Sequence, residues 1–184
     1  MLHYYGYICK AVDELKKRYK QTDPFKLCEA MGISVLFRNM GEAEGSCKGF
    51  FMTQSRIRCI VINSALSTVL GRIICAHELG HAVLHGKDEI NTFHEVRMFD
   101  ENTQKEKEAN VFAAELLLND EDVNAVLNDD ITFFNAAAKL HVPAELLDFK
   151  FRVMKCKGYK LVDAPLHSPS NFLKKVQDEG ALYD

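Results

Sequence analysis

The stretch IICAHELGHAVLHG, residues 73–86, restricts the fold and chemistry of this chain more than any other feature. Its apolar residues indicate a half-buried helix, yet it carries His77, Glu78 and His81. Helical residues four apart lie on one face with Cβ atoms about 5–6 Å apart, so both imidazoles can be directed at one point. Glu78 is rotated from His77 by about 100° and lies beside that point. The spacing H-E-x-x-H predicts a metal site in which Glu78 is the general base.

The motif alone leaves a simpler alternative open, in which the histidines are surface or capped core residues without a metal. A catalytic zinc site has three protein ligands and one open position, so a third ligand has to be found. His85 is on the same face as His81, but helix rise separates it from His77 by about 12 Å. We therefore expect His85 to cap the helix or to support a ligand. The candidates that follow the motif are His85, Glu89, His94, Glu95, Glu106 and Glu108.

Glu106 belongs to a second predicted helix, TQKEKEANVFAAELLLN, over residues 103–119. Glu106, Asn110 and Ala113 share one face, and the small side chains there suit close packing against another helix. Glu106 can thus face the histidines. However, Thr103 and Glu106 also fit a capping box, in which Glu106 would only satisfy backbone donors. The residues by themselves leave both interpretations open.

Composition excludes several other classes of protein. The chain has 184 residues, of which 47% are hydrophobic and 27% charged, as is typical of a soluble globular protein. A net charge of -3 provides no large basic field for a phosphate backbone. The uncharged run over 59–71 is shorter than the roughly 20 residues that span a bilayer, and no secretory signal is visible at the start. The 6 cysteines form no C-x-x-C pair, which favours reduced thiols and a cytoplasmic protein without membrane contact.

The pattern along the chain predicts an α+β fold that is mostly helical, with a small three-stranded β-sheet that contains a hairpin. The helix that carries the motif should begin at an N-cap at Asn63 or Ser64. We expect a domain over 1–128 and a C-terminal helical extension over 129–184, helix-turn-helix-like and packed on the first part as one structural unit. The predicted strands cover 33–40, 48–53 and 58–63, and the predicted helices cover 4–19, 25–31, 64–85, 103–119, 120–128, 130–140 and 144–156, with a loop at 87–102 and a helical turn near 172–176.

Two sequence blocks carry a family resemblance. AHELGHAVLHG is followed about thirty residues later by E-x-x-A-N-x-F-A-A-x-L-L, and it is preceded by a short hairpin that ends in INS. Together they resemble the ImmA/IrrE family of zinc metallopeptidases, which bacteria, phages and mobile elements encode, over residues from about 30 to 155. The chain departs from the family at LLLND, residues 116–120, where a Met-Pro ending is common. This departure concerns only how the second helix ends.

The resemblance implies a zincin-like domain with Zn²⁺ bound by His77, His81 and Glu106, and with Glu78 as the catalytic residue. Glu108 is the alternative third ligand, because only one of these two glutamates can face the metal. The implied substrate is a helix-turn-helix repressor, cleaved to derepress mobile-element or stress genes. The rival hypothesis is a non-proteolytic, zinc-containing regulatory module that binds a repressor or DNA. Glu78 favours the enzyme, since a structural site needs no base beside its ligands.

Three further hypotheses concern other segments. The segment over 131–155 invites comparison with a helix-turn-helix, but its mixed charge favours core packing, so direct DNA binding is not expected. An extended substrate could add to the sheet edge at 48–53 or 58–63. Cys47 could approach the zinc as a redox-controlled blocking ligand, although an inert role is favoured. The sequence assigns no oligomeric state.

Overall fold

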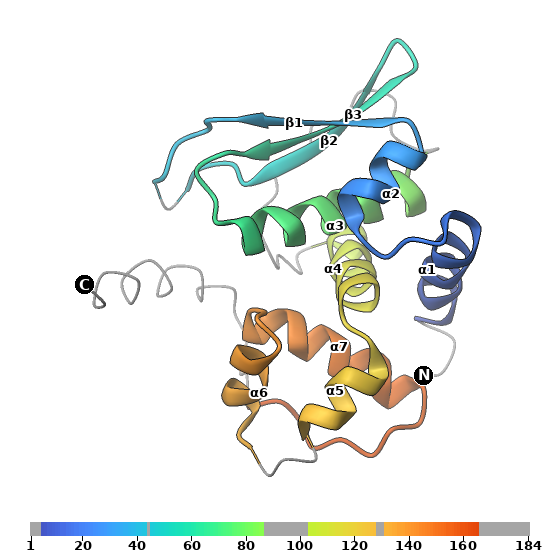
Figure 1. Ribbon diagram of the computed structural model, residues 1–184, viewed down its shortest axis with the longest axis vertical. Helices are drawn as coiled ribbons and strands as arrows, with labels where there is room; N and C mark the ends of the chain where they lie inside the picture. Colours follow the sequence, from blue (N-terminus) through green and yellow to red (C-terminus); the bar gives the residue numbers. More distant parts are fainter. Residues whose placement is uncertain (1–4, 44, 87–102, 128–130, 166–184) are drawn as a thin grey trace.

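The computed structural model describes residues 5–43, 45–86, 103–127 and 131–165 (Figure 1). Helices dominate these residues, and the strands form one small sheet, so the predicted fold class is confirmed. The predicted loop at 87–102 and the helical turn near 172–176 lie outside the described residues. The elements are α1 (Gly6–Tyr19), α2 (Pro24–Ala30), β1 (Ile33–Arg38), β2 (Gly49–Gln54), β3 (Ile57–Asn63), α3 (Thr68–Leu84), α4 (Gln104–Leu117), α5 (Asp120–Leu127), α6 (Phe133–Lys139) and α7 (Ala144–Cys156).

The sheet has the strand order β1-β3-β2 and lies over one side of α3 (Figure 1). β3 pairs parallel with β1 and antiparallel with β2. The predicted hairpin is β2–β3, joined by Ser55 and Arg56 with φ angles of 50° and 69°. A two-residue turn with positive φ at both positions matches the twist of a hairpin. β3 is therefore the central strand, and its Ile60 and Ile62 belong to the core.

Helix α3 is enclosed on both sides. The sheet covers one side and α4 covers the other, so residues 73–82 are all buried. A helix that is apolar around most of its circumference is the pattern expected for such a position. The polar side chains of the H-E-x-x-H motif consequently lie in the interior of the protein.

The beginning of α3 differs from the prediction. Its N-cap is Ser67, whose side chain accepts a hydrogen bond from the backbone N–H of Leu70, so the predicted caps at Asn63 and Ser64 are wrong. Asn63 is buried at the end of β3 and ties together the loops around it. Its side chain bonds to backbone groups of Met40, Gly41, Cys47 and Ala65.

The contact between α3 and α4 is unusually close at Gly80. A Cβ atom at this position would lie 3.2 Å from the Cα atom of Ala109 and 3.1 Å from the ring of Phe112. Only glycine lets the two backbones approach to this distance without a shift of the neighbours. This approach brings the first turn of α4 towards the histidines of α3.

Of the C-terminal helices, α7 packs on α4, while α6 packs on α7 and α5 on α6 (Figure 1). In α7, the side chains of Leu147, Phe151 and Met154 are buried, and so is Lys150. The second helix of the helix-turn-helix-like segment thus contributes to the core, as the mixed charge of this segment favoured. The boundary at residues 128 and 129 stays a prediction.

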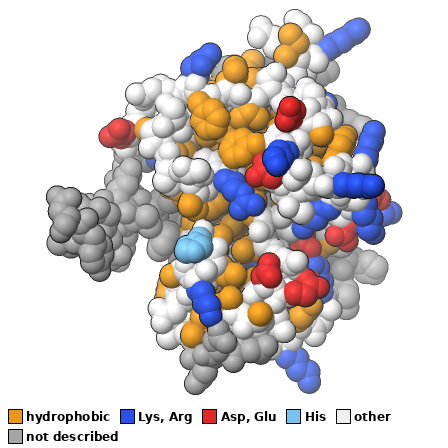
Figure 2. All heavy atoms as spheres, viewed as in Figure 1, with side chains coloured by type: hydrophobic (Ala, Val, Ile, Leu, Met, Phe, Trp, Pro, Cys, Tyr) orange, Lys and Arg blue, Asp and Glu red, His pale blue; other side chains and the backbone are white. Residues whose placement is uncertain are grey.

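Two surface properties bear on possible partners. On the face shown in Figure 2, Lys and Arg side chains are interspersed with Asp and Glu rather than gathered into a basic stripe. Among the described residues, no helix has both the length and the hydropathy needed to cross a membrane.

Candidate metal centre

Three of the predicted site residues meet at the crossing of α3 and α4. His77 Nε2 lies 3.2 Å from Glu106 Oε2, and His81 Nε2 lies 3.2 Å from Glu106 Oε1. The two Nε2 atoms are 3.1 Å apart. The side chains of His77, His81 and Glu106 are 4%, 0% and 13% exposed. Each offers one ligand atom, and these atoms lie within 4.8 Å of one another, so they form a candidate metal site.

The donor set fits a cation. The Nδ1–H of His77 donates to the side-chain oxygen of Asn110 at 2.9 Å, so in the neutral form of His77 the Nε2 atom presents a lone pair. This lone pair faces a carboxylate and a second imidazole. Acceptor atoms that converge in a buried space require a positive charge between them. A divalent metal ion bound by nitrogen and oxygen atoms would satisfy all three.

The ionisation of Glu106 and His81 suits metal binding, whereas His77 must release a proton when a metal binds. Burial lowers the pKa of His81 to about 4, although Glu106 acts in the opposite direction. For His77, burial also lowers the pKa, but the hydrogen bond to Glu106 and the charge of Glu78 outweigh it and the net pKa is raised. Burial raises the pKa of Glu106, yet the hydrogen bonds from His77 and His81 hold it well below its ordinary value. Near neutral pH, Glu106 is a carboxylate and His81 is neutral, as metal ligands must be.

Glu78 lies next to this cluster. It follows His77 in α3, its side chain is fully buried, and its charge contributes to the raised pKa of His77. A second buried carboxylate thus interacts with His77, and the role of Glu78 as a general base stays a prediction.

The two interpretations of Glu106 are now separated. Thr103 is the N-cap of α4, and its Oγ1 accepts a hydrogen bond from the backbone N–H of Glu106 at 3.2 Å. The side chain of Glu106 extends to the two histidines instead of returning to the cap. The backbone of Glu106 thus takes part in the cap, while its carboxylate joins the candidate metal cluster.

Glu108, the alternative third ligand, is directed elsewhere. Its Oε2 atom lies 2.8 Å from His85 Nε2, and it is not part of the candidate metal cluster. His85 caps the end of α3, where its backbone N–H donates to the carbonyl oxygen of His81. The expectation that His85 is a capping or supporting residue is confirmed, whereas Glu108 as a ligand is wrong.

The remaining candidates do not reach the cluster or cannot be placed. The thiol of Cys47 donates to the carbonyl oxygen of Gly49 at 3.6 Å, and Cys47 is not a member of the metal cluster that the described residues form. The blocking role suggested for Cys47 therefore receives no support. Glu89, His94 and Glu95 lie outside the described residues.

The sequence interpretation missed the role of Asn110. This residue is buried in α4, one helical turn beyond Glu106, and it orients His77. The shared face of Glu106 and Asn110 could have indicated this contact, because a buried asparagine requires hydrogen-bond partners.

Comparisons with known proteins agree with this geometry. Residues 28–152 match the IrrE N-terminal-like domain, the Peptidase M78 family. The chain therefore belongs to this family of metallopeptidases, and the resemblance inferred from the sequence is confirmed. It is 37% identical over 146 residues to Uncharacterized immunity region protein 2 of Bacillus phage phi105, covering 79% of this chain and 90% of the phage protein. It is 30% identical over 142 residues to Metallopeptidase ImmA of Bacillus subtilis strain 168, covering 76% and 80% of the two chains.

Proposed function

We propose that this chain is a zinc-dependent endopeptidase, with His77, His81 and Glu106 as the ligands of Zn²⁺ and Glu78 as the general base. The convergence of two imidazole nitrogens and one carboxylate beside a second buried carboxylate carries this proposal. Structural zinc is held by four protein ligands, whereas catalytic zinc has three and an open position. Three ligands with an adjacent base suit the catalytic arrangement.

In the proposed reaction, bound zinc supplies a Lewis acid that polarises the peptide carbonyl and makes a water molecule more acidic. Glu78 accepts a proton from this water as its oxygen attacks the carbonyl carbon. The carbon–nitrogen bond then breaks, and Glu78 returns the proton to the departing amine nitrogen. Asn110 keeps His77 in the tautomer that presents Nε2. The burial of Glu78 and His81 keeps bulk water away from the reacting groups.

The sheet offers a place for an extended substrate. β3 is paired on both sides, so the suggestion that residues 58–63 form the receiving edge is wrong. Within the described part of the chain, β2 pairs with β3 alone, and it contacts α3. We propose that substrate backbone adds to the outer edge of β2, where main-chain hydrogen bonds would align it with the metal helix.

Membership of a peptidase family implies a protein substrate. We propose that this substrate is a helix-turn-helix transcriptional repressor and that its cleavage derepresses mobile-element or stress genes. The resemblance to the ImmA/IrrE family supports this choice, and so does the similarity to a phage immunity region protein. A repressor encoded beside the gene is the first candidate.

Co-expression with the neighbouring repressor tests the proposal. We expect wild-type protein to cleave the repressor. Glu78→Gln should slow cleavage by about 10²–10⁴-fold, as loss of a general base does, while the purified variant retains zinc. Glu121→Gln, the same replacement at an exposed position of α5, is the matched control and should cleave normally. Zinc-loaded wild type that leaves the repressor intact but binds it would support a non-proteolytic module instead.

A further inference from the structure

A chain of hydrogen bonds leads away from the metal cluster behind His81. The Nδ1 atom of His81 lies 3.3 Å from Nδ1 of His85, and Nε2 of His85 lies 2.8 Å from a carboxylate oxygen of Glu108. His85 is 6% exposed. The side chain of Glu108 also accepts a hydrogen bond from Gln104.

The positions of the protons in this chain follow from its last member. The carboxylate of Glu108 can only accept, so His85 carries its proton on Nε2 and donates it to Glu108. When His85 carries this one proton, its Nδ1 atom is an acceptor. A proton on Nδ1 of His81 then completes the chain at the 3.3 Å contact and leaves the lone pair of His81 Nε2 directed at Glu106 and His77.

Glu108 is well suited to anchor the chain because several donors stabilise its charged form. Hydrogen bonds from His85, Gln104 and Tyr7 reach its carboxylate. Tyr7 belongs to α1, and Gln104 lies one turn earlier in α4. The carboxylate is thus held from two helices.

We infer that His85 and Glu108 are positioning residues that fix His81 as a metal ligand through Nε2. This inference rests on the proposed metal site. Helix α4 would then orient both histidine ligands of α3, His77 directly through Asn110 and His81 through the pair of Glu108 and His85. Partners of this kind hold the ring and increase the basicity of the ligand nitrogen.

The test is a double-mutant cycle on zinc affinity, measured by competition with a chelator in the full chain. His85→Ala and Glu108→Gln should each weaken zinc binding by about 10–100-fold, as is typical when an outer-shell partner is lost. Because Glu108 acts through His85, the double variant should bind zinc no more weakly than His85→Ala. Unchanged affinity in the single variants, or effects that multiply in the double variant, would overturn the inference.

His85→Gln separates positioning from packing. Its side-chain oxygen can accept from His81 and its amide can donate to Glu108, so this variant should recover part of the affinity that His85→Ala loses. A zinc affinity of His85→Gln no higher than that of His85→Leu would contradict the inference. Glu121→Gln is the control for loss of a carboxylate. Unfolding of each metal-free variant is measured alongside, and if the His85 variants do not fold, the affinity of Glu108→Gln decides alone.

A spectroscopic measurement reports the tautomer directly. Nitrogen-15 spectra of the histidine rings in zinc-loaded protein should show His81 protonated at Nδ1 and bound to the metal through Nε2. The opposite assignment would contradict the proposed chain. Wild type that binds no zinc would disprove the proposed function, whereas zinc-binding wild type with unaffected His85 and Glu108 variants would disprove only the inference.

Discussion

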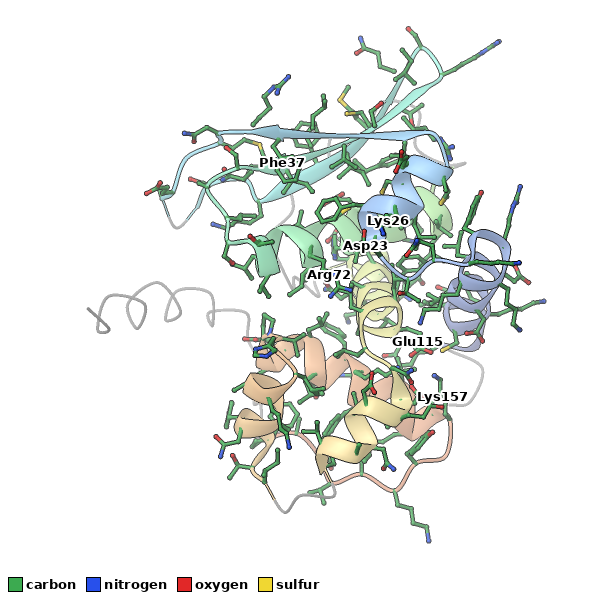
Figure 3. All side chains as sticks on the ribbon, viewed as in Figure 1. Asp23, Lys26, Phe37, Arg72, Glu115 and Lys157 are labelled. Carbon is green, nitrogen blue, oxygen red and sulfur yellow. The ribbon has the colours of Figure 1, made fainter. Side chains whose placement is uncertain are left out.

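The two ends of α4 contribute to two clusters of charged side chains that differ in their balance of charge. The first turn provides Glu106 to the candidate metal centre, and the last turn provides Glu115 to a group that we call the lysine cluster. In this cluster, Lys150 Nζ lies 2.6 Å from Glu115 and 2.5 Å from Asp120. Lys157 Nζ lies 2.5 Å from Glu115 and 2.8 Å from Asp120 (Figure 3). The lysine cluster consists of Glu115, Asp120, Lys150 and Lys157.

The lysine cluster neutralises itself, because two ammonium groups face two carboxylates. The metal centre does not, since Glu78 and Glu106 are accompanied by imidazoles and burial keeps His81 neutral. Burial of charge is costly unless each charge has a partner. The comparison indicates that the lysine cluster joins α4, α5 and α7. The metal centre instead has an excess of negative charge, which a bound cation can balance.

Removal of one partner from the lysine cluster should have the largest effect on stability. Lys150→Ala removes the buried partner of Glu115 and of the half-buried Asp120, and a broken buried pair costs about 3–5 kcal/mol. We expect urea unfolding of metal-free protein to show a loss near the lower end of this range. Lys155→Ala, on the same helix but paired with the exposed Asp163, is the control and should change the unfolding midpoint little. Equal effects of the two variants would mean that the lysine cluster does not join the helices.

Removal of metal should have the next largest effect, and it should depend only on the metal centre. With free zinc at about 100 times its Kd, binding stabilises the folded state by about 2.7 kcal/mol. A chelator should remove this contribution from the wild type in thermal or urea unfolding. In Glu106→Gln the chelator should have little effect, and the metal-free variant should be less stable than metal-free wild type, because the interactions of His77 and His81 with the charged carboxylate are lost. A chelator response that persists in Glu106→Gln would place the metal elsewhere.

Closer packing of α3 and α4 should disturb the metal centre selectively. Gly80→Ala forces a methyl group against Ala109 and Phe112, and overpacking costs about 1–3 kcal/mol. The better helix propensity of alanine offsets about 0.5–1 kcal/mol of this, so we expect a net loss near 1 kcal/mol together with weaker zinc binding. Gly71→Ala is the control on the same helix, where the nearest atom lies at an ordinary 3.9 Å. Gly71→Ala should keep zinc affinity, and weaker binding there would show that the effect is not specific to the crossing.

The smallest expected effect is the acid response of the lysine cluster. Burial raises the pKa of Asp120, but hydrogen bonds from Lys150 and Lys157 outweigh it and lower the pKa below the ordinary 3.8. The unfolded chain therefore binds a proton first as pH falls, so this contribution is present above pH 3.8 and is lost below it. In Asp120→Asn, the free energy of unfolding should fall less steeply as pH drops below 3.8, the acid limb of the stability curve, when unfolding is followed with chelator present. An unchanged limb would show that Asp120 is not the titrating group.

Local patterns in the sequence predicted most of the helices and strands, and they predicted the part of the site that lies on α3. The repeat of apolar residues indicated the helices and strands to within a few residues, because each element buries one face at its own period. The spacing of His77, Glu78 and His81 indicated the metal helix for the same reason. The start of α3 was misplaced, since Asn63 and Ser67 are both good caps and only the loops around Asn63 show which of them is used.

The sequence by itself determined that one helix carries two histidines on a common face with a glutamate beside them, because spacing within a helix is a property of neighbouring residues. Only the tertiary structure decided that Glu106 completes this face, that Glu108 supports it through His85, and that Glu115 meets Lys150 at the other end of the same helix. These pairs are separated by 23 to 35 residues in the chain. Their contact depends on where helices cross, and at the crossing of α3 and α4 Gly80 allows the close approach of the two backbones.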